Sequence, residues 1–454
     1  MGPRVLVVAD DVTGATDASV QFVGRGLRAA VLLTPRLWCR QDAGELPAVF
    51  PEPPDVLALN TQSRSSPPDD IRQRMGAAAR VIRELQPQLV LKKVDSTFRG
   101  NVGLEVTLLA EALAPDVVLV APSYPALARV IVGGYLLIHG QLVTATEVAK
   151  DPATPVSDAH LPSLLRSQTG LPVGHLELRH VCRGHDAIVS RLVRLRDEGV
   201  RVVACDAVSD EDLLHIARAA TGLYRRILWV GAAGLAAALA ELAGGLAGRP
   251  SPSSGLENRC EPPVPGGGQP GAPPAVLVVV GSLSRVARAQ LGALATSGVP
   301  VTVLDPDALY SDFNQAARSA ACKAGSALRG TGSARSPSDR SPVAALATSD
   351  RRSSLQGLHA GAAGVVPHLV GRVTAMLDVP PGTALVLTGG DTAYGVLDEA
   401  GCVGLRVCRE LMPGVPLSLA VAGCFDRSPV VTKAGGFGDE TALLRIVDML
   451  LNRC

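Results

Sequence analysis

The stretch from Leu89 to Asn101, which reads LVLKKVDSTFRGN, constrains the fold more than any other part of this chain. An apolar run over residues 89–91 stops abruptly, and mostly polar side chains follow it. This pattern predicts a buried strand that delivers polar groups at its carboxyl end, where ligands bind in open α/β sheets. The alternative is a solvated turn with ordinary surface charge, which so dense a cluster after an apolar strand disfavours. The polar groups suit an anion that also carries hydroxyls, and they are Lys92, Lys93, Asp95, Ser96, Thr97, Arg99 and Asn101.

The charge balance limits the partners that this chain can attract. Its 454 residues are enough for two or three domains, each with its own core. With 43 basic and 42 acidic residues the formal net charge is +1, so no overall field favours nucleic acid or an anionic membrane. We therefore expect neither as a partner, and any preference for anions must be local.

The cysteines and the apolar runs indicate the compartment. Nine cysteines, an odd number with no C-x-x-C pair, suggest reduced thiols rather than a disulfide framework. The apolar run that ends at Asp10 is too short for a signal peptide. The longest apolar stretch, residues 227–240, is too short to span a bilayer. We expect a cytoplasmic protein.

Two further apolar runs repeat the pattern of a strand that ends in polar groups. Residues 5–9 are followed by Asp10 and Asp11, and residues 56–59 are followed by Arg64. Adjacent carboxylates could hold magnesium, accept hydrogen bonds from a polyol or act as a general base, whereas a simple helix N-cap at Asp11 is the alternative. The alternation of such strands with helices predicts a parallel, doubly wound sheet.

The composition changes again over residues 249–274, where Pro, Gly and Ser dominate. We interpret this segment as a linker between a domain at 1–248 and a domain at 275–454. The predicted fold class is α/β, with two domains that each contain a largely parallel sheet flanked by helices, and a ligand cleft between them. The linker would permit closure of that cleft. Residues 311–354 show little periodicity, so we expect a poorly ordered insertion or weakly packed helices there.

The second domain contains three junctions in which a strand, small residues and a helix follow one another: LVVVGSLSRVA, LVLTGGDTAYG and VVTKAGGFGDE. Such junctions bring backbone amides and a helix N-terminus to an anion, and three of them in one domain indicate a nucleotide. No P-loop pattern occurs, and GGFG lacks the spacing of the dinucleotide fingerprint. The phosphates are therefore expected in another kind of loop, and a nicotinamide dehydrogenase is disfavoured.

These motifs together resemble the four-carbon acid sugar kinases, formerly a domain of unknown function. The resemblance rests on ADDVTGATD, NTQSR, KKVDSTFRGN, VGSLS, LTGGDTA and VVTKAGGFGDE, which occur in order over nearly the whole chain. It implies that an N-terminal domain binds a four-carbon sugar acid and a C-terminal domain binds ATP. It further implies phosphorylation of the terminal 4-hydroxyl. KKVDSTFRGN is more similar to the D-threonate and D-erythronate branch than to the 3-oxo-tetronate branch.

The resemblance places residues 93–96, Asp11 and Arg64 on the substrate, and Ser282, residues 389–392 and Gly435 near ATP. Combined with the residue patterns, it leads us to expect substrate contacts from Asp10, Asp11, Arg64, Lys92, Lys93, Asp95, Ser96, Arg99 and Arg129. The expected nucleotide contacts are Ser282, Gly389, Gly390, Asp391, Thr392, Gly435 and Gly436, with Asp391 as a ligand of Mg²⁺.

A mechanism follows as a hypothesis. Arg64 and Lys93 would bind the carboxylate of the sugar acid and so direct its other end towards ATP. Asp11 would orient or deprotonate the attacking hydroxyl, with Asp95 as the rival base. Amides at the start of the helix beside Asp391 would stabilise charge on the phosphate.

Two departures from the family pattern keep alternatives open. The family usually reads glycine-arginine-threonine where this chain has Ala128, Arg129 and Val130, and Ala232 stands where a serine is expected. The alternatives are a 3-oxo-tetronate 4-kinase and a non-catalytic sensor of sugar acids or nucleotides; the intact ADD, DST and GGDT motifs argue against the sensor. The apolar helix at residues 232–243 fits a core or a subunit interface, so a homo-oligomer also stays open.

Overall fold

The computed structural model describes residues 2–151, 153–245, 273–329, 342–349 and 365–452. The chain divides into two compact units, Met1–Ser253 and Ser254–Cys454. The expected linker at 249–274 lies almost wholly outside the described residues. Within the described part of the chain, no helix combines the length and the apolar character needed to cross a bilayer.

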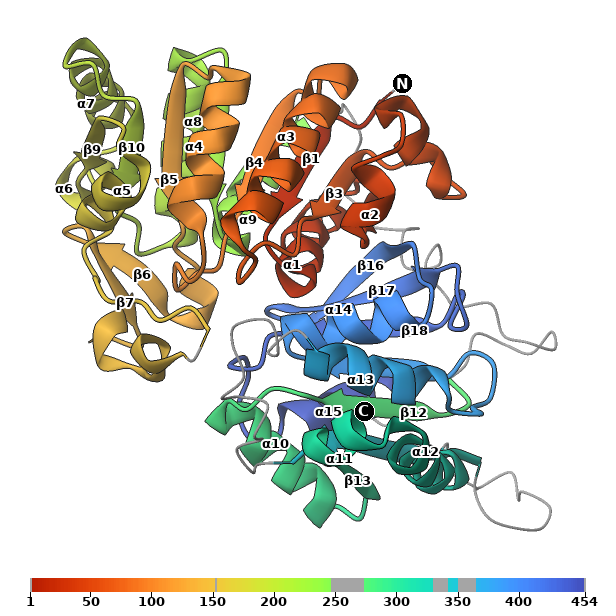
Figure 1. The fold of residues 1–454 in the computed structure, drawn as a ribbon. Helices are drawn as coiled ribbons and strands as arrows, with labels where there is room; N and C mark the ends of the chain where they lie inside the picture. Colours follow the sequence, from red (N-terminus) through yellow and green to blue (C-terminus); the bar gives the residue numbers. More distant parts are fainter. Residues whose placement is uncertain (1, 152, 246–272, 330–341, 350–364, 453–454) are drawn as a thin grey trace. The chain divides into compact units, whose positions relative to one another are not determined.

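The first unit is built on a sheet of eight parallel strands (Figure 1). Its strands are short and almost entirely buried because helices cover both faces, which explains their continuous apolar sequences. In order across the sheet they are β2 (Ala29–Leu32), β3 (Val56–Asn60), β1 (Val5–Ala9), β4 (Leu89–Lys93), β11 (Ile227–Gly231), β5 (Val117–Ala121), β10 (Val202–Cys205) and β9 (Val173–Leu176). The prediction of a parallel α/β sheet is confirmed.

Two layers of helices enclose this sheet (Figure 1). One layer contains α3 (Pro68–Leu85), α4 (Val102–Leu113) and α5 (Leu161–Thr169), and the other contains α1 (Val12–Val23), α9 (Ala233–Gly245), α8 (Asp210–Leu223) and α7 (His185–Asp197). The helix α3 buries Ile71, Met75 and Ala78, which recur at the spacing of one helical face. Two short helices, α2 (Pro35–Trp38) and α6 (Leu178–Val181), lie in connections.

A small antiparallel sheet extends the first unit. It contains β6 (Arg129–Val132), β7 (Tyr135–Ile138) and β8 (Gln141–Leu142), with a turn at Gly140 between β7 and β8. The buried carboxylate of Asp206 accepts hydrogen bonds from the backbone amides of Gly133 and Gly134 at 2.8 and 2.9 Å. This carboxylate therefore ties the turn between β6 and β7 to the main sheet.

The second unit has its own sheet, in which five parallel strands are followed by two antiparallel ones. Across the sheet they are β13 (Val301–Leu304), β14 (Val343–Thr348), β12 (Val276–Val280), β15 (Ala384–Thr388), β18 (Pro429–Lys433), β17 (Val415–Val421) and β16 (Gly404–Met412). One helix layer contains α10 (Arg285–Thr296) and α15 (Ala442–Leu450); the other contains α11 (Pro306–Ser311), α12 (Phe313–Arg329), α13 (Val365–Ala375) and α14 (Gly390–Glu399).

For the segment 311–354 we expected a poorly ordered insertion or weakly packed helices. The segment contains the whole of the helix α12 and, contrary to that expectation, the strand β14, which lies between β13 and β12 and is largely buried. The strand sequence VAALAT has few β-branched residues, so its conformation depends on pairing with two neighbours rather than on its own propensity. The helix α12 buries small residues on one face, including Ala317, Ala320 and Ala324. Residues 330–341 and 350–354 lie outside the described part.

Candidate functional site

Three of the predicted strand ends lie side by side in the first unit. The strand β1 pairs with β3 on one side and β4 on the other, and all three run in the same direction. After β1 the chain continues to β2 and β3 on one side and later reaches β4 on the other, so this is a topological switch point of the sheet. Asp10 and Asp11 follow β1, Arg64 follows β3, and Lys93 ends β4. The structure thus brings together residues that are far apart in the sequence.

Arg64 connects the two adjacent carboxylates. Its guanidinium donates to both oxygens of Asp10 at 2.9 and 3.0 Å, and it lies 2.8 Å from Oδ2 of Asp11. Both aspartates are almost fully buried, whereas the Arg64 side chain retains 20% of its exposure. Burial alone would raise the pKa of Asp10, but Arg64, Lys92 and Lys93 lower it below its usual value. These cations favour the anionic form of Asp10, and both of its oxygens orient the arginine.

Asp11 caps a helix, which was one of the two interpretations, and it also lies in the charged cluster. It is the N-cap of α1: its carboxylate accepts from the amide of Gly14 at 2.6 Å and from the hydroxyl of Thr13 at 2.8 Å. The same carboxylate belongs to the charged cluster through Arg64. At Gly14 a Cβ atom would lie 2.9 Å from Nζ of Lys93, so glycine lets this lysine lie against the first turn of the helix.

Lys92 and Lys93 have different surroundings because successive side chains of a strand point to opposite faces. Nζ of Lys93 donates to the carbonyl of Val94 at 2.8 Å and has no carboxylate within ion-pair distance among the described residues. Lys92 is fully buried and pairs with Glu105 of α4 at 3.1 Å. The structure therefore places Lys93 in the charged cluster and gives Lys92 an internal counter-ion.

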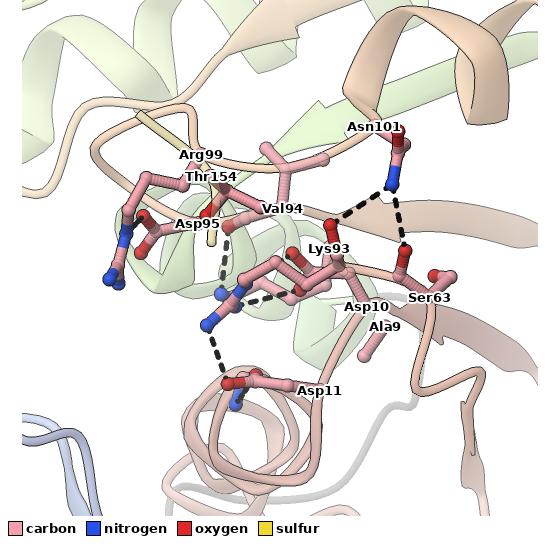
Figure 2. A network of polar contacts seen from close by, with 12 residues as sticks. Ala9, Asp10, Asp11, Ser63, Lys93, Val94, Asp95, Arg99, Asn101 and Thr154 are labelled. Atoms are coloured by element: carbon pink, nitrogen blue, oxygen red, sulfur yellow. Dashed lines mark hydrogen bonds and ion pairs between the residues drawn. The ribbon is translucent and has the colours of Figure 1, made fainter. Parts of the chain in front are cut away.

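A second charged group surrounds Asp95. Nε of Arg99 donates to it at 2.7 Å, Thr97 donates to the same carboxylate, and Arg99 also pairs with Asp151 at 2.9 Å. Burial acts to raise the pKa of Asp95, but nearby arginines, above all Arg99 and then Arg64, hold it well below its usual value. Figure 2 shows Asp95 and Arg99 beside Asp10, Asp11 and Lys93. Arg129, the first residue of β6, donates to the hydroxyl of Ser96.

Three residues outside the expected site support this cluster. Asn101 and Gly100 belong to the stretch 89–101 but had no expected role of their own, and Glu105 was not expected at all. Nδ2 of Asn101 donates to the carbonyls of Ser63 and Arg64 at 3.2 and 3.0 Å, which fixes the loop that carries the arginine (Figure 2). Gly100 has φ +95°, and a Cβ there would lie 2.8 Å from the Arg64 side chain. Glu105 was detectable as a lone acid in the first turn of an apolar helix, whereas the loop contacts have no sequence signal.

The two departures from the family pattern have visible local consequences. Ala128 adopts a left-handed conformation, φ +50°, which costs an alanine about 1–2 kcal/mol and a glycine little. Arg129 nevertheless reaches Ser96. Ala232 directly precedes α9, and its carbonyl accepts from the amide of Ala236. A serine there could cap the helix; alanine lacks that hydrogen bond at a typical cost of about 1 kcal/mol.

The three glycine junctions of the second unit also meet, because β12, β15 and β18 are neighbours in the sheet. The hydroxyl of Ser284 donates to the carbonyl of Gly435 at 2.9 Å, and the amide of Gly389 donates to the carbonyl of Lys433 at 2.9 Å. A Cβ at Gly435 would lie 2.1 Å from Oγ of Ser282, so only glycine allows these loops to pack this closely.

The predicted nucleotide residues occupy these junctions. Ser282 follows β12, and Gly389, with φ +102°, is the N-cap of α14, whose first residues are Gly390, Asp391 and Thr392. The amides at the start of α14 form a helix N-terminus of the type that binds phosphate. Gly435 and Gly436 form a turn, and α15 begins only at Ala442, so the third junction presents a turn rather than a helix end.

The described residues contain no group of three or more His, Cys, Asp or Glu side chains that could hold a metal ion by themselves. Asp391 is an exposed carboxylate at the start of α14. Magnesium that accompanies a nucleotide usually takes one or two carboxylates and completes its shell with phosphates and water. The side chains present fit such a shared site and do not fit an all-protein cage.

Comparison with known families supports sugar binding by the first unit and nucleotide binding by the second. Residues 5–239 match the model of a sugar-binding N-terminal domain, and residues 277–443 match that of a nucleotide-binding C-terminal domain.

Relatives match over almost the entire chain. A D-threonate kinase of Salmonella typhimurium is 33% identical, covering 97% of this chain and 96% of its own. A D-erythronate kinase of Heliobacterium modesticaldum is 28% identical, covering 99% and 98%. A 3-oxo-tetronate kinase of Cupriavidus necator is 31% identical, covering 96% and 94%. A crystal structure from Salmonella typhimurium LT2, described as that of a tRNA synthase, superposes with a TM-score of 0.72 at 23% identity over 97% and 98% of the two chains, which shows the fold alone.

Proposed function

This chain belongs to the four-carbon acid sugar kinase family, and from that premise we propose that it transfers the γ-phosphoryl group of ATP to the terminal hydroxyl of D-threonate or D-erythronate. The observation that carries the proposal is the meeting of Asp11, Arg64 and Lys93 at the carboxyl ends of three neighbouring strands. The cations of this cluster suit the carboxylate at one end of a sugar acid. Its carboxylate suits the hydroxyl at the other end.

Lys93 is the cation best suited to the carboxylate of the sugar acid. It is 4% exposed and has no carboxylate partner in the described part of the chain, so a ligand carboxylate would compensate a buried ammonium group. Arg64 is already shared by Asp10 and Asp11, and its proposed contact with the substrate adds to that pairing rather than replacing it. Ser96, Arg99 and Arg129 would contribute further polar contacts.

In the proposed reaction the terminal oxygen of the acid forms a bond to the γ-phosphorus while the bond from that phosphorus to the β-phosphate oxygen breaks. ADP leaves, and the hydroxyl proton moves to Asp11. Asp95 is the less suitable base, because nearby arginines hold its pKa well below its usual value. Asp11 is the candidate that remains, and the family resemblance places it on the substrate. Amides at Gly390, Gly435 and Gly436 would stabilise the phosphate charge.

Magnesium would be held by Asp391 together with the phosphates, and it would neutralise charge on them. The protein's own part is to orient the two reactants, because phosphoryl transfer depends mainly on positioning and electrostatic stabilisation.

Phosphorus NMR tests the proposal directly. The purified protein would be incubated with ATP, magnesium and, in separate tubes, D-threonate, D-erythronate, L-threonate and 3-oxo-tetronate. We expect a new phosphomonoester signal with D-threonate or D-erythronate. Unreacted ATP in every tube, from protein shown to be folded by circular dichroism, would refute the proposal and favour a sensor.

One alternative has its own support. The 3-oxo-tetronate kinase relative is nearly as similar as the D-threonate kinase, at 31% against 33% identity. A signal with 3-oxo-tetronate alone would establish this alternative, because a single hydroxyl or carbonyl is distinguished by the hydrogen bonds of the pocket.

The two carboxylates are separated by matched variants. We expect Asp11→Asn to lower kcat by about 100-fold or more, the usual scale for a general base, and Asp95→Asn to act mainly on the KM for the acid. Full turnover by Asp11→Asn would exclude Asp11 as the base.

A further inference from the structure

Lys433 is a buried lysine that none of the expected contacts includes. It is the last residue of β18 and has no exposed surface. Its Nζ atom donates to the carbonyl of Ala434 at 2.9 Å and to the carbonyl of Phe437 at 3.0 Å. No carboxylate of the described residues lies within ion-pair distance of it, and burial lowers the pKa of its ammonium group to about 7. The protein therefore buries a cation without supplying an anion.

The two carbonyls belong to the glycine turn, residues 434–438. A second buried side chain holds the same turn: Nε2 of Gln290 on α10 donates to the carbonyl of Phe437 at 2.9 Å and to that of Asp439 at 2.8 Å. Lys433 and Gln290 thus bind carbonyls of the turn from the interior of the unit. These hydrogen bonds fix the backbone conformation of the turn.

The amides of the turn are left for another partner. Neither the amide of Gly435 nor that of Gly436 donates a hydrogen bond to any residue that the structure describes. The turn also lies against the first junction, since Ser284 donates to the carbonyl of Gly435. Consecutive amides of this kind, next to a buried cation, form a binding site for an anion.

We propose that Lys433 positions the glycine turn for a nucleotide phosphate and that the charge of this phosphate compensates the buried ammonium group. The inference deepens the proposed function and rests on it for the identity of the ligand, a nucleoside polyphosphate. Two independent features support it: the hydrogen bonds that shape the turn, and the lack of an internal counter-ion. In a low-dielectric interior, a cation and a phosphate attract each other strongly even without a direct contact.

The test compares Lys433→Met with Gln290→Met in the full chain. Both remove donors to the carbonyl of Phe437, but only the first removes a charge. Calorimetric titration with Mg-ADP, without any sugar acid, gives the dissociation constant. We expect Lys433→Met to weaken ADP binding by about tenfold or more, because it removes both a donor that shapes the turn and the charge that attracts the phosphate. Gln290→Met should weaken ADP binding by less.

A second readout separates positioning from general damage. The KM for ATP should rise in Lys433→Met while the KM for the sugar acid stays within about twofold, because the acid binds in the other unit. Lys433→Arg should recover part of the ADP affinity through its charge. If Lys433→Met does not fold, Lys433→Gln, which keeps a donor but no charge, replaces it with the same expectation.

Unchanged ADP affinity in Lys433→Met would overturn the inference. Equal rises in the KM for ATP and in the KM for the acid would also overturn it. Because ADP binding is measured without an acid, its result is independent of the phosphorylation test. Wild-type protein that binds ADP but phosphorylates no acid would refute the proposed function and leave the role of Lys433 to be decided by the affinities. Wild-type protein that does not bind ADP would refute both.

Discussion

Lys92 and Lys433 occupy similar places and have opposite surroundings. Each is fully buried near the carboxyl end of a parallel strand, β4 in the first unit and β18 in the second. Lys92 pairs with the buried carboxylate of Glu105, whereas Lys433 donates to two carbonyls of the glycine turn. A buried lysine with an internal counter-ion serves the fold, while one without a counter-ion is suited to the charge of a ligand. From this comparison we predict a structural role for Lys92 and a functional role for Lys433.

The largest expected effect is on the Lys92–Glu105 pair. Lys92→Met leaves a buried carboxylate without its cation, which should lower the free energy of unfolding by about 3–5 kcal/mol. Urea denaturation followed by circular dichroism measures this value.

The double variant Lys92→Met/Glu105→Leu is the matched control. It removes both charges, so we expect it to recover most of the lost stability. A single Lys92→Met variant with unchanged stability and a raised KM for the acid would contradict the structural assignment and return Lys92 to the substrate site.

The next largest effect concerns Lys93, which has no carboxylate partner among the described residues and so resembles Lys433. Lys93→Met should raise the KM for the sugar acid by roughly 10- to 150-fold, which corresponds to the loss of a charged hydrogen bond of about 1.5–3 kcal/mol. Steady-state kinetics with the acid varied at saturating ATP measures it. The KM for ATP is the internal control, and a rise in both constants would argue for general damage.

The stability of the protein should also depend on pH through Lys433. Below about pH 7 the Lys433 ammonium is charged in both the folded and the unfolded protein, so the cost of its burial is fully present. As pH rises from 7 towards 9, the folded protein loses this proton while the unfolded chain retains it, so stability increases by up to about 1.4 kcal/mol per pH unit. The stability of wild type relative to Lys433→Met should therefore rise over this range when measured by urea denaturation without nucleotide. A difference independent of pH would show that Lys433 does not titrate there.

The smallest effect tests how Glu105 is held. The hydroxyl of Ser63 donates to this carboxylate from the loop after β3. Ser63→Ala removes one hydrogen bond but leaves Lys92 in place, so a loss of about 1 kcal/mol in unfolding free energy is expected. A loss as large as that of Lys92→Met would mean that the hydroxyl, not the lysine, stabilises the carboxylate.

Much of the charged cluster in the first unit could be predicted, because the local sequence shows where each strand ends. The run 5–9 ends at Asp10 and the run 89–91 stops at Lys92, so the residues at the edge of the sheet were identifiable. The partner of each charged group could not be predicted in the same way. Glu105 lies on a helix, and nothing in the sequence shows that it faces Lys92 rather than solvent.

The sequence by itself determined the alternation of strands and helices, the residues at the strand ends and the three glycine junctions, because these depend on local hydrophobic pattern and turn chemistry. Only the tertiary structure decided that β14 is a strand, that Lys92 has a carboxylate partner and that Lys433 donates to backbone carbonyls instead. The physical reason is that burial and charge pairing depend on neighbours distant in the sequence. A strand-end lysine looks the same in the sequence whether a carboxylate or a glycine turn lies beside it.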